Sequence, residues 1–397
     1  MELLIYLILF LLVLIVSSTT NKLLPFLPLP LVQILLGIVI GLFLPNTDFH
    51  LNTELFLALV IGPLLFRESE EADITAILKH WRIIIYLIFP VIFISTLSLG
   101  GLAHLLWLSL PLAACLAVGA ALGPTDLVAF ASLSERFSFP KRVSNILKGE
   151  GLLNDASGLV AFQVALTAWT TGAFSLGQAS SSLIFSILGG FLIGFLTAMT
   201  NRFLHSFLLS VRATDIASEL LLELSLPLVT FFLAEEVHVS GIIAVVVAGI
   251  LKASRFKKIT LLEAQVDTVT ETVWHTVNFM LNGSVFVILG MELEMIVEPI
   301  LTNPIYNPLL LLGSLIALTF ILFAIRFVMI YGYYAYRTRR LKKKLNKYMK
   351  DMLLLTFSGV KGTVSIATIL LIPSDLEQKY PLLLFLVAGV TLVSFLT

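Results

Sequence analysis

The fold is decided by Gly149-Glu150-Gly151-Leu152-Leu153-Asn154-Asp155-Ala156-Ser157-Gly158, a stretch that carries two carboxylates into an apolar segment. Apolar residues continue to about Trp169, so the sequence predicts one helix over residues 146–169. A charged side chain near the centre of a bilayer-length helix costs about 3 kcal/mol on insertion scales. Asp155 therefore needs a partner, water or a functional role, and it is the leading candidate for a functional residue.

Composition places the chain among integral membrane proteins. Hydrophobic residues make up 58% and charged residues 13% of the 397 positions, whereas soluble domains are about 45–50% apolar and about 25% charged. The N-terminal apolar run has no Lys or Arg before it, which favours a first membrane helix over a signal peptide. Net charge is zero, which says nothing about partners. The expected partner of a membrane protein is the lipid bilayer, and no nucleic-acid partner is expected. The single cysteine, Cys115, excludes an internal disulfide.

Thirteen apolar segments approach the length of about 20 residues that a membrane span needs. They cover residues 3–18, 24–44, 51–66, 83–106, 110–133, 146–169, 182–204, 216–234, 237–251, 273–291, 308–334, 352–372 and 380–397. With the N-terminus outside, 22 of the 25 Lys and Arg residues fall in inner loops, and Lys379 alone falls outside. This asymmetry follows the positive-inside rule. It predicts an all-α polytopic membrane protein with an outer N-terminus and an inner C-terminus.

The two remaining basic residues, Arg326 and Lys361, lie inside predicted spans and must meet acids or carbonyl groups there. The candidate buried acids are Asp126, Glu150 and Asp155. Arg326 is the natural partner of Glu150, which lies one helical turn before Asn154 on the same helix face. The alternative is that each pair only holds helices together, and for Lys361 the two interpretations stay equally open.

Two predicted spans are interrupted near their middle. The fifth contains residues 123–126 (GPTD), and the twelfth contains residues 358–363 (SGVKGT). Proline lacks an amide hydrogen and disfavours helix in the residue before it. If two six-span halves are joined by the seventh span, these interruptions occupy matching positions. Matching interruptions are the best sequence indication of a transporter's ion site.

The chemistry of an ion site gathers around the interrupted fifth span. Asp126 lies at the break, and Asp155 lies about 14 Å into the sixth span at a rise of 1.5 Å per residue, so both fall near the bilayer centre. Unwound backbone at this depth must line a cavity or be buried in protein. Freed carbonyls, the Thr125 hydroxyl and two carboxylates are hard oxygen ligands suited to a small cation. We expect Asp155 to hold either a proton or a cation and Asn154 to shape the site; a structural hydrogen-bonding role is the alternative.

Five segments in chain order carry a resemblance to a known family. Residues 149–155 (GEGLLND) resemble the asparagine–aspartate motif of the cation/proton antiporter-1 family, the sodium/proton exchangers of NhaP and NHE type. Residues 123–126 look like the front of its broken-helix motif, and residues 359–365 are similar to its Gly-x-Arg-Gly segment. Residues 62–66 with Trp81 and Arg82 are similar to its third-span exit, and residues 288–293 resemble its tenth-span end.

The resemblance implies an NhaA-like fold of two inverted six-helix repeats, in which unwound helices 5 and 12 cross. It implies one transmembrane domain over residues 1–397. Within it, spans 4–6 and 11–13 (residues 83–169 and 308–397) form the core, and spans 1–3 and 7–10 (residues 1–82 and 182–291) form a dimerisation scaffold. A homodimer is therefore expected. No cytosolic C-terminal domain is expected within this chain.

The function implied by the resemblance is secondary active antiport rather than enzymatic catalysis, with no cofactor. Na⁺, or alternatively Li⁺ or K⁺, would be exchanged for H⁺ across the plasma membrane, with roles in pH and sodium homeostasis. Asp155 would carry the cation and the proton, Asp126 and Thr125 would contribute ligands to Na⁺, and Asn154 would favour electroneutral one-for-one exchange.

The remaining charged residues receive supporting roles from the resemblance. Glu150 and Arg326 would form a structural ion pair near the site, and Lys361 is a candidate for charge compensation in helix 12. Three positions depart from the family pattern: Leu127 replaces a proline, Lys361 an arginine, and Gly151 a serine found in some members. Lys and Arg are not interchangeable where a bidentate contact is needed, so the full ligand set stays open.

Three other classes compete with an antiporter. An ion channel needs rings of carbonyls or charges as a filter, and no filter-like segment is visible. An intramembrane aspartyl protease needs two carboxylates that share a proton and water, and Asn154 has no role in that chemistry. A non-transporting sensor on the same fold is the third alternative, and an intact Asp155 argues against it.

Overall fold

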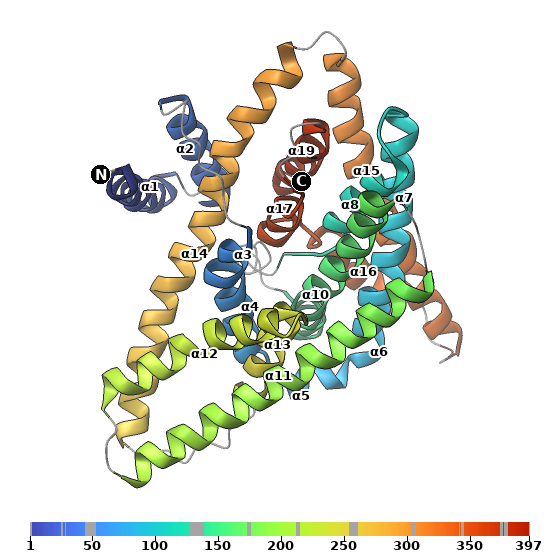
Figure 1. Ribbon diagram of the computed structural model, residues 1–397. Coiled ribbons are helices and arrows are strands. Elements are labelled where there is room, and N and C mark those ends of the chain that lie inside the picture. Colours follow the sequence, from blue (N-terminus) through green and yellow to red (C-terminus); the bar gives the residue numbers. More distant parts are fainter. Residues whose placement is uncertain are drawn as a thin grey trace. The chain divides into compact units, whose positions relative to one another are not determined.

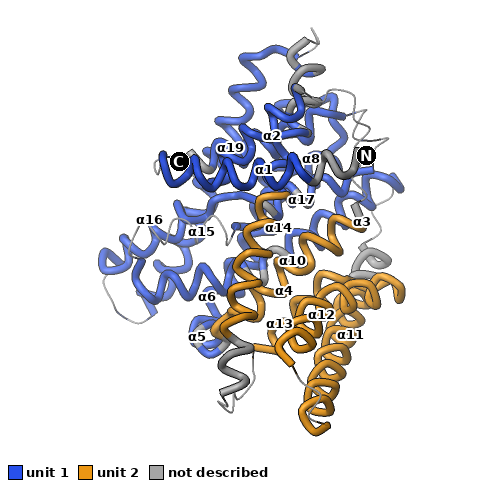
Figure 2. The backbone as a smooth tube through the Cα atoms, turned by 90° about the vertical axis from the view of Figure 1, so that its left-hand side faces the viewer, with its two compact units in different colours: residues 1–48, 75–174, 285–397 blue, residues 49–74, 175–284 orange. Residues whose placement is uncertain are grey.

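A computed structural model describes residues 2–24, 27, 29–43, 53–126, 139–172, 176–211, 215–253, 261–302, 306–340, 342, 345–373, 376 and 380–396. Every regular element in these ranges is a helix (Figure 1). The chain divides into two compact units (Figure 2), one of residues 1–48, 75–174 and 285–397 and one of residues 49–74 and 175–284. We call them unit 1 and unit 2 and describe each by itself.

Unit 1 contains the segments in which the sequence predicts the ion site. Its helices are α1 (Glu2–Leu23), α2 (Leu29–Phe43), α5 (Ile74–Lys79), α6 (Trp81–Tyr86), the π-helix η2 (Leu87–Val91), α7 (Ile92–Leu106), α8 (Leu112–Ala121), α10 (Lys141–Thr171), α15 (Pro308–Arg340), the 3₁₀-helix η3 (Leu345–Tyr348), α16 (Met349–Phe357), α17 (Thr363–Ile369) and α19 (Pro381–Leu396). Residues 285–302 of α14 (Leu261–Thr302) also belong to unit 1.

Unit 2 holds α3 (Thr53–Phe56), the π-helix η1 (Leu57–Ile61), α4 (Gly62–Glu70), α11 (Leu176–Ser210), α12 (Ile216–Glu236) and α13 (Gly241–Ala253), together with residues 261–284 of α14. Its helices approach closely at glycines. A Cβ atom on Gly194 of α11 would overlap the Ala244 carbonyl of α13, and one on Gly249 of α13 would lie 2.7 Å from the Ser69 side chain of α4. Small residues at such contacts allow helix backbones to pack without intervening side chains.

Local sequence explains several helix ends and irregularities. Asp215 caps α12, because its carboxylate accepts from the Ser218 N–H at 2.8 Å and the Ser218 hydroxyl accepts from the Asp215 N–H in return. Gly172 ends α10 in the left-handed region, at φ 68°, which glycine adopts without steric cost. The π-helical turn η2 contains Pro90, whose missing N–H interrupts regular helical bonding.

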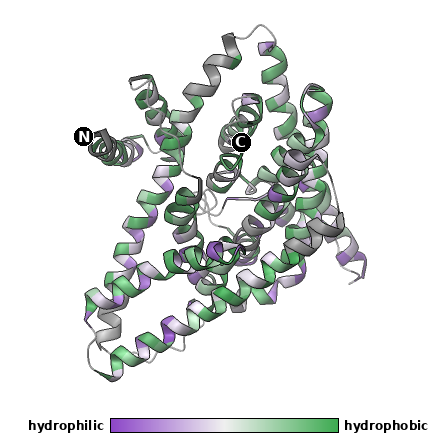
Figure 3. Ribbon diagram, in the orientation of Figure 1, coloured by the Kyte–Doolittle hydropathy of each residue, from purple (hydrophilic) through white to green (hydrophobic). Residues whose placement is uncertain are grey.

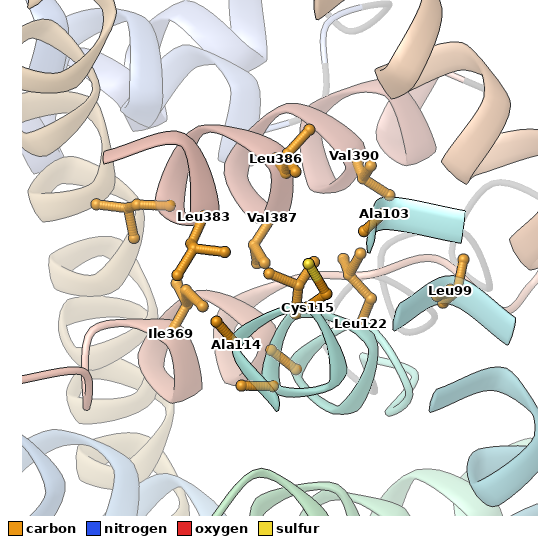
Figure 4. Packing of buried hydrophobic residues seen from close by; sticks show 14 of the residues in the cluster. Leu99, Ala103, Ala114, Cys115, Leu122, Ile369, Leu383, Leu386, Val387 and Val390 are labelled. Carbon is orange, nitrogen blue, oxygen red and sulfur yellow. The ribbon is translucent and has the colours of Figure 1, made fainter. Parts of the chain in front are cut away.

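One hydrophobic cluster of unit 1 lies between α7, α8, α17 and α19, and a second lies between α6, η2, α10, α15 and α16. Figure 4 shows Leu99 of α7, Cys115 of α8, Ile369 of α17 and Val387 of α19 converging in the first cluster, and all four are at most 1% exposed. Helix α8 is rich in alanine, so its backbone lies close to that of α7. A Cβ atom on Gly100 of α7 would lie 2.8 Å from the Leu116 backbone. This close packing holds the end of α8, where the predicted site begins.

The described helices have the length and hydropathy of membrane spans. Trp81–Leu106, Ile184–Ser210, Ile216–Glu236, Thr268–Met291 and Pro308–Arg340 are each long and apolar enough to cross a bilayer, and five shorter apolar helices accompany them. Hydrophobic residues predominate along the helices (Figure 3). The chain is therefore an integral, multi-pass membrane protein.

Several helices run beyond the spans that the sequence predicts, among them α10, α11 and α14. Helix α10 covers residues 141–171 instead of 146–169, and α14 has 42 residues where a span over residues 273–291 was predicted. At 1.5 Å per residue α14 is about 63 Å long, roughly twice the hydrocarbon thickness of a bilayer. Hydropathy marks only the apolar part of such a helix, because its hydrogen bonding continues into polar sequence.

Candidate functional site

The candidate site lies where two helices of unit 1, α8 and α16, end inside the predicted fifth and twelfth membrane spans. Helix α8 ends at Ala121 and is followed by non-helical residues 122–126, and non-helical residues 358–362 separate α16 from α17. These breaks coincide with the two interruptions indicated by the sequence. The backbone N–H of Asp126 donates to the Val360 carbonyl at 2.9 Å, so the two non-helical segments lie side by side. Their pairing satisfies backbone groups that a helix would otherwise satisfy.

Lys361 joins the two breaks through its side chain. Its ammonium donates to the carbonyls of Gly123 at 2.7 Å and Pro124 at 2.6 Å, and the residue is 1% exposed. Both carbonyls belong to the non-helical residues that follow the C-terminus of α8, where the partial negative charge of the helix end favours a cation. The Lys361 N–H in turn donates to the Ser394 hydroxyl of α19 at 3.1 Å. The lysine therefore links three segments that are far apart in the sequence.

Glu150 of α10 and Arg326 of α15 form a buried bidentate ion pair. The two guanidinium Nη atoms donate to the two carboxylate oxygens at 2.6 Å and 2.8 Å, and the residues are 1% and 4% exposed. The Arg326 Nε donates to the Leu355 carbonyl near the end of α16 at 2.9 Å. Planar guanidinium geometry suits this double contact. The pair thus connects α10, α15 and the break after α16.

Thr125 connects this ion pair to Asn154. Its hydroxyl donates to Glu150 Oε1 at 3.3 Å and accepts from Asn154 Nδ2 at 2.8 Å. Glu150 and Asn154 are four residues apart, which places both on one face of α10, toward the break that holds Thr125. Asn154 is 1% exposed, and within the described residues its Oδ1 has no hydrogen-bond partner. A buried acceptor without a partner costs about 1–3 kcal/mol, so this oxygen is available to an incoming ligand.

The two aspartates take different places in this arrangement. Asp126 is 5% exposed, and its carboxylate lies against Gly362, where any added Cβ atom would overlap it. Asp155 follows Asn154 on α10, but its side chain lies outside the described residues, as does Leu127. The structure thus brings Thr125, Asp126, Glu150, Asn154, Arg326 and Lys361 into one region of unit 1.

Three glycines that sequence reasoning did not assign to the site are required by its packing. A Cβ atom on Gly158 of α10 would overlap the Pro124 ring, and one on Gly359 would lie 2.5 Å from Arg326 Nε. Gly362 makes room for Asp126 in the same way. These glycines were visible in the two motif segments, yet a single sequence does not record which neighbour each one faces. Ser394 was missed because nothing in the apolar sequence around it marks the contact with Lys361.

Comparisons with known proteins agree with one another. The family model described as sodium/hydrogen exchanger, transmembrane, matches residues 7–397. The chain is 36% identical over 385 residues to the sodium, potassium, lithium and rubidium/H⁺ antiporter of Bacillus subtilis (strain 168), an alignment that covers 95% of this chain and 57% of that relative. It is 31% identical over 416 residues to the uncharacterized Na⁺/H⁺ exchanger YjcE of Escherichia coli (strain K12), covering 99% of this chain and 74% of that protein.

The fold has a solved counterpart. The sodium proton antiporter MjNhaP1 from Methanocaldococcus jannaschii, at pH 8, superposes with a TM-score of 0.71 and 19% sequence identity, covering 100% of this chain and 96% of that one. At this identity the likeness concerns the fold. The chain spans 57% and 59% of the lengths of the Bacillus subtilis and Bacillus pumilus antiporters that it matches.

Proposed function

Because the chain belongs to the sodium/hydrogen exchanger family, whose members are transporters rather than enzymes, we propose that it exchanges Na⁺ for H⁺ across the membrane. The cation and the proton compete for the carboxylate of Asp155, and alternating access opens the site to one side of the membrane at a time. The plasma membrane is the typical location of this family. The exchange serves pH and sodium homeostasis.

The observation that carries this proposal is the charge balance of the buried network. Its described members are two carboxylates, Asp126 and Glu150, and two cations, Arg326 and Lys361, so these four charges cancel. Asp155, next to the buried Asn154, adds one negative charge. A net charge within the membrane is costly, and one proton or one monovalent cation neutralises it. One-for-one exchange keeps the network neutral in both loaded states, so we propose an electroneutral cycle.

The oxygen atoms available at the site favour a small, hard cation. The unpartnered Asn154 Oδ1 and the remaining lone pair of the Thr125 hydroxyl complement the carboxylates of Asp126 and Asp155. Such oxygen donors suit small hard cations. The Bacillus subtilis relative is named for sodium, potassium, lithium and rubidium, so Li⁺, K⁺ and Rb⁺ belong among the cations to compare with Na⁺.

The architecture proposed for this cycle follows the predicted topology. Thirteen spans with an outer N-terminus and an inner C-terminus form two inverted six-helix repeats, and the broken fifth and twelfth spans cross at the site. Spans 4–6 and 11–13 form the moving core, and the other spans form a scaffold through which two copies dimerise. Irregular backbone at the crossing of repeats is the common location of ion sites in secondary transporters.

The decisive test is exchange in proteoliposomes that contain a trapped pH dye. An imposed Na⁺ gradient is expected to drive proton movement in the wild type, and Asp155→Asn is expected to abolish it because asparagine cannot hold either ion by charge. A potassium–valinomycin clamp should leave the rate unchanged if the cycle is electroneutral. Apparent Na⁺ affinity should weaken as pH falls, since protons compete for the same carboxylate.

The matched control is Glu236→Gln, which neutralises an exposed carboxylate in unit 2. This variant should exchange at the wild-type rate, and Asp155→Asn should elute as a folded protein in size-exclusion chromatography. Exchange retained by Asp155→Asn would refute the assignment of the carrier. Voltage-dependent movement would refute electroneutrality, and no movement with any alkali cation would favour the sensor alternative.

A further inference from the structure

A basic and aromatic cavity lies in unit 1, and none of its described lining residues belongs to the candidate ion site. It has a volume of about 610 Å³ and is walled by α6 and the C-terminal part of α15. The Tyr86 hydroxyl donates to the Met329 carbonyl at 3.1 Å, and the rings of Tyr86 and Tyr333 lie 5.2 Å apart, so the two walls are held together. The lining residues that bear on its ligand are Lys79, Trp81, Arg82, Tyr336, Arg337 and Arg340.

The positive charge of the residues that line this cavity favours an anionic ligand. Among the described residues that line it, four are Lys or Arg and none is acidic. Within the described ranges, none of these four side chains forms an ion pair with a carboxylate. His80, also in the lining, has its pKa lowered by burial first and then by the positive charges of Arg142, Lys79 and Arg337. Three positive charges near His80 thus contribute to the lowered pKa after burial, and an anionic ligand would be attracted to them.

The surroundings of the cavity are those of a membrane–water interface. Trp81 and Tyr336 are 50% and 69% exposed at its rim, and Trp and Tyr gather at the headgroup level of membranes. Exposed apolar side chains continue from both walls. On the α6 side they are Ile85, Phe89 and Phe93, and on α15 they are Val328, Phe320 and Ile316, each four or eight residues from the next.

These features together distinguish a lipid from a free anion. Spacings of four or eight residues place the exposed apolar side chains of each set on neighbouring parts of one helix side, so apolar surface leads away from the basic cavity. An inorganic anion would use the charges alone. A phospholipid would use both parts, with its phosphate among the basic side chains and its acyl chains along the apolar surfaces, as in basic pockets between membrane helices that bind lipid headgroups.

We propose that the cavity between α6 and α15 is a binding site for the phosphate headgroup of an anionic phospholipid. Arg82, Arg337 and Arg340 supply the guanidinium groups that recognise phosphate oxygens. Lys79 adds a flexible positive charge, and Trp81 and Tyr336 set the depth of the headgroup. The proposal concerns lipid binding and holds whether or not the ion-exchange assignment holds.

The test compares lipid retention by the detergent-purified protein using native mass spectrometry. The probes are phosphatidylglycerol, phosphatidylcholine and inorganic phosphate. The triple variant R82Q/R337Q/R340Q removes three cavity charges. The matched control R339Q/K347Q/K350Q removes three exposed charges that neighbour the cavity in sequence but do not line it.

Wild type and the control variant are expected to bind phosphatidylglycerol with equal affinity. The cavity variant is expected to bind it about a hundredfold more weakly, because each of the three removed basic residues contributes roughly a fivefold factor in affinity. Phosphatidylcholine should bind weakly to all three, and millimolar phosphate should not displace phosphatidylglycerol. Circular dichroism checks folding, and if the triple variant is misfolded, Arg337→Gln alone is judged by the same comparison with Arg339→Gln. Equal binding by cavity and control variants, or equal binding of phosphatidylcholine, would overturn the proposal. Displacement by free phosphate would assign the cavity to a soluble anion instead.

Discussion

Each compact unit contains a network of acidic and basic side chains, and the two networks differ in geometry and burial. In unit 1 the Glu150–Arg326 pair is bidentate, with its shortest contact at 2.6 Å and side chains 2% and 4% exposed. In unit 2, Lys252 lies 2.7 Å from Glu223 and 3.7 Å from Glu70, and these side chains are 9% to 15% exposed. Water therefore reaches the second network more readily than the first.

In unit 2 the basic side chains of the network also have more than one acidic partner each. Arg67 contacts Glu70 at 2.9 Å and Glu71 at 2.7 Å, and the Trp274 indole donates to Glu223 at 2.9 Å. Three carboxylates thus share two cations, whereas in unit 1 one carboxylate is matched to one guanidinium. Removing one partner from a fully buried pair leaves an uncompensated charge. Removing one partner from a partly solvated network leaves other charged side chains and water to compensate the remaining charge. The two units should therefore lose different amounts of stability on the same kind of substitution.

The largest effect is expected for Glu150→Ala in unit 1. It leaves Arg326 buried without a carboxylate, and breaking such a pair costs about 3–5 kcal/mol. Thermal unfolding in detergent should show this loss, whereas apparent Na⁺ affinity should change much less. Glu223→Ala in unit 2 is the comparison variant and should unfold at a temperature closer to wild type. A change in affinity with unaltered stability would instead make Glu150 an ion ligand.

A somewhat smaller loss is expected for Lys361→Met. The substitution keeps the length of the side chain but leaves the Gly123 and Pro124 carbonyls without their donor. Charged hydrogen bonds contribute about 1.5–3 kcal/mol, so the free energy of unfolding should fall by about that amount. Exchange should fall as well, because the two breaks lose the side-chain link between them and keep only the Asp126–Val360 hydrogen bond. Lys252→Met in unit 2 is the control, and a stability loss there as large as that of Lys361→Met would contradict the comparison.

Replacing the arginine of unit 1 by lysine, and the lysine of unit 2 by arginine, should show how far the stability of each network depends on bidentate geometry. Arg326→Lys retains the charge but loses the double contact with Glu150 and the bond to the Leu355 carbonyl, at an expected cost of about 1–2 kcal/mol. Lys252→Arg in unit 2 should be nearly neutral, since several carboxylates can receive it. Melting temperatures of the two variants, measured side by side, test this. Equal tolerance of both would show that bidentate geometry contributes little in unit 1.

The smallest effect concerns pH and Glu70 of unit 2. Burial raises the pKa of this carboxyl above its usual 4.5, with Glu223 adding to the rise and Lys252 and Arg67 opposing it. The folded state then holds the proton more tightly than the unfolded state. The resulting stabilisation is complete below pH 4.5 and is lost as pH rises through the folded pKa.

Glu70→Gln mimics the protonated form and does not titrate. It should match wild type near pH 4.5 and become slightly more stable than wild type as pH rises toward 8, which a series of thermal melts would measure. Glu71→Gln is the control for removing a carboxylate from this network, because the Glu71 side chain is 58% exposed, and it should melt close to wild type. A Glu70→Gln variant that is less stable at pH 8 would mean that the attraction of Arg67 and Lys252 outweighs the cost of burial.

The sequence predicts some of the contacts in the candidate site, whereas others depend on packing between distant segments. Glu150 and Arg326 were indicated as partners because each is a charge in an apolar span, and the structure places their atoms 2.6 Å apart. For Lys361 the sequence predicts acids or carbonyl groups as partners and a role in charge compensation, but which carbonyls it contacts depends on how α8 ends. Gly158 and Ser394 were not assigned at all, since their importance comes from Pro124 and Lys361, which are distant in the sequence.

The sequence by itself determined that the protein is a helical membrane protein, because hydropathy and the distribution of Lys and Arg are properties of local composition. It also located the two helix breaks, since proline and glycine alter backbone bonding wherever they occur. Only the tertiary structure decided that the breaks lie together through the Asp126–Val360 bond, that Thr125 joins Asn154 to Glu150, and that a basic cavity opens between α6 and α15. Those features are distances between segments up to about 260 residues apart, and long-range packing sets such distances while local propensity does not.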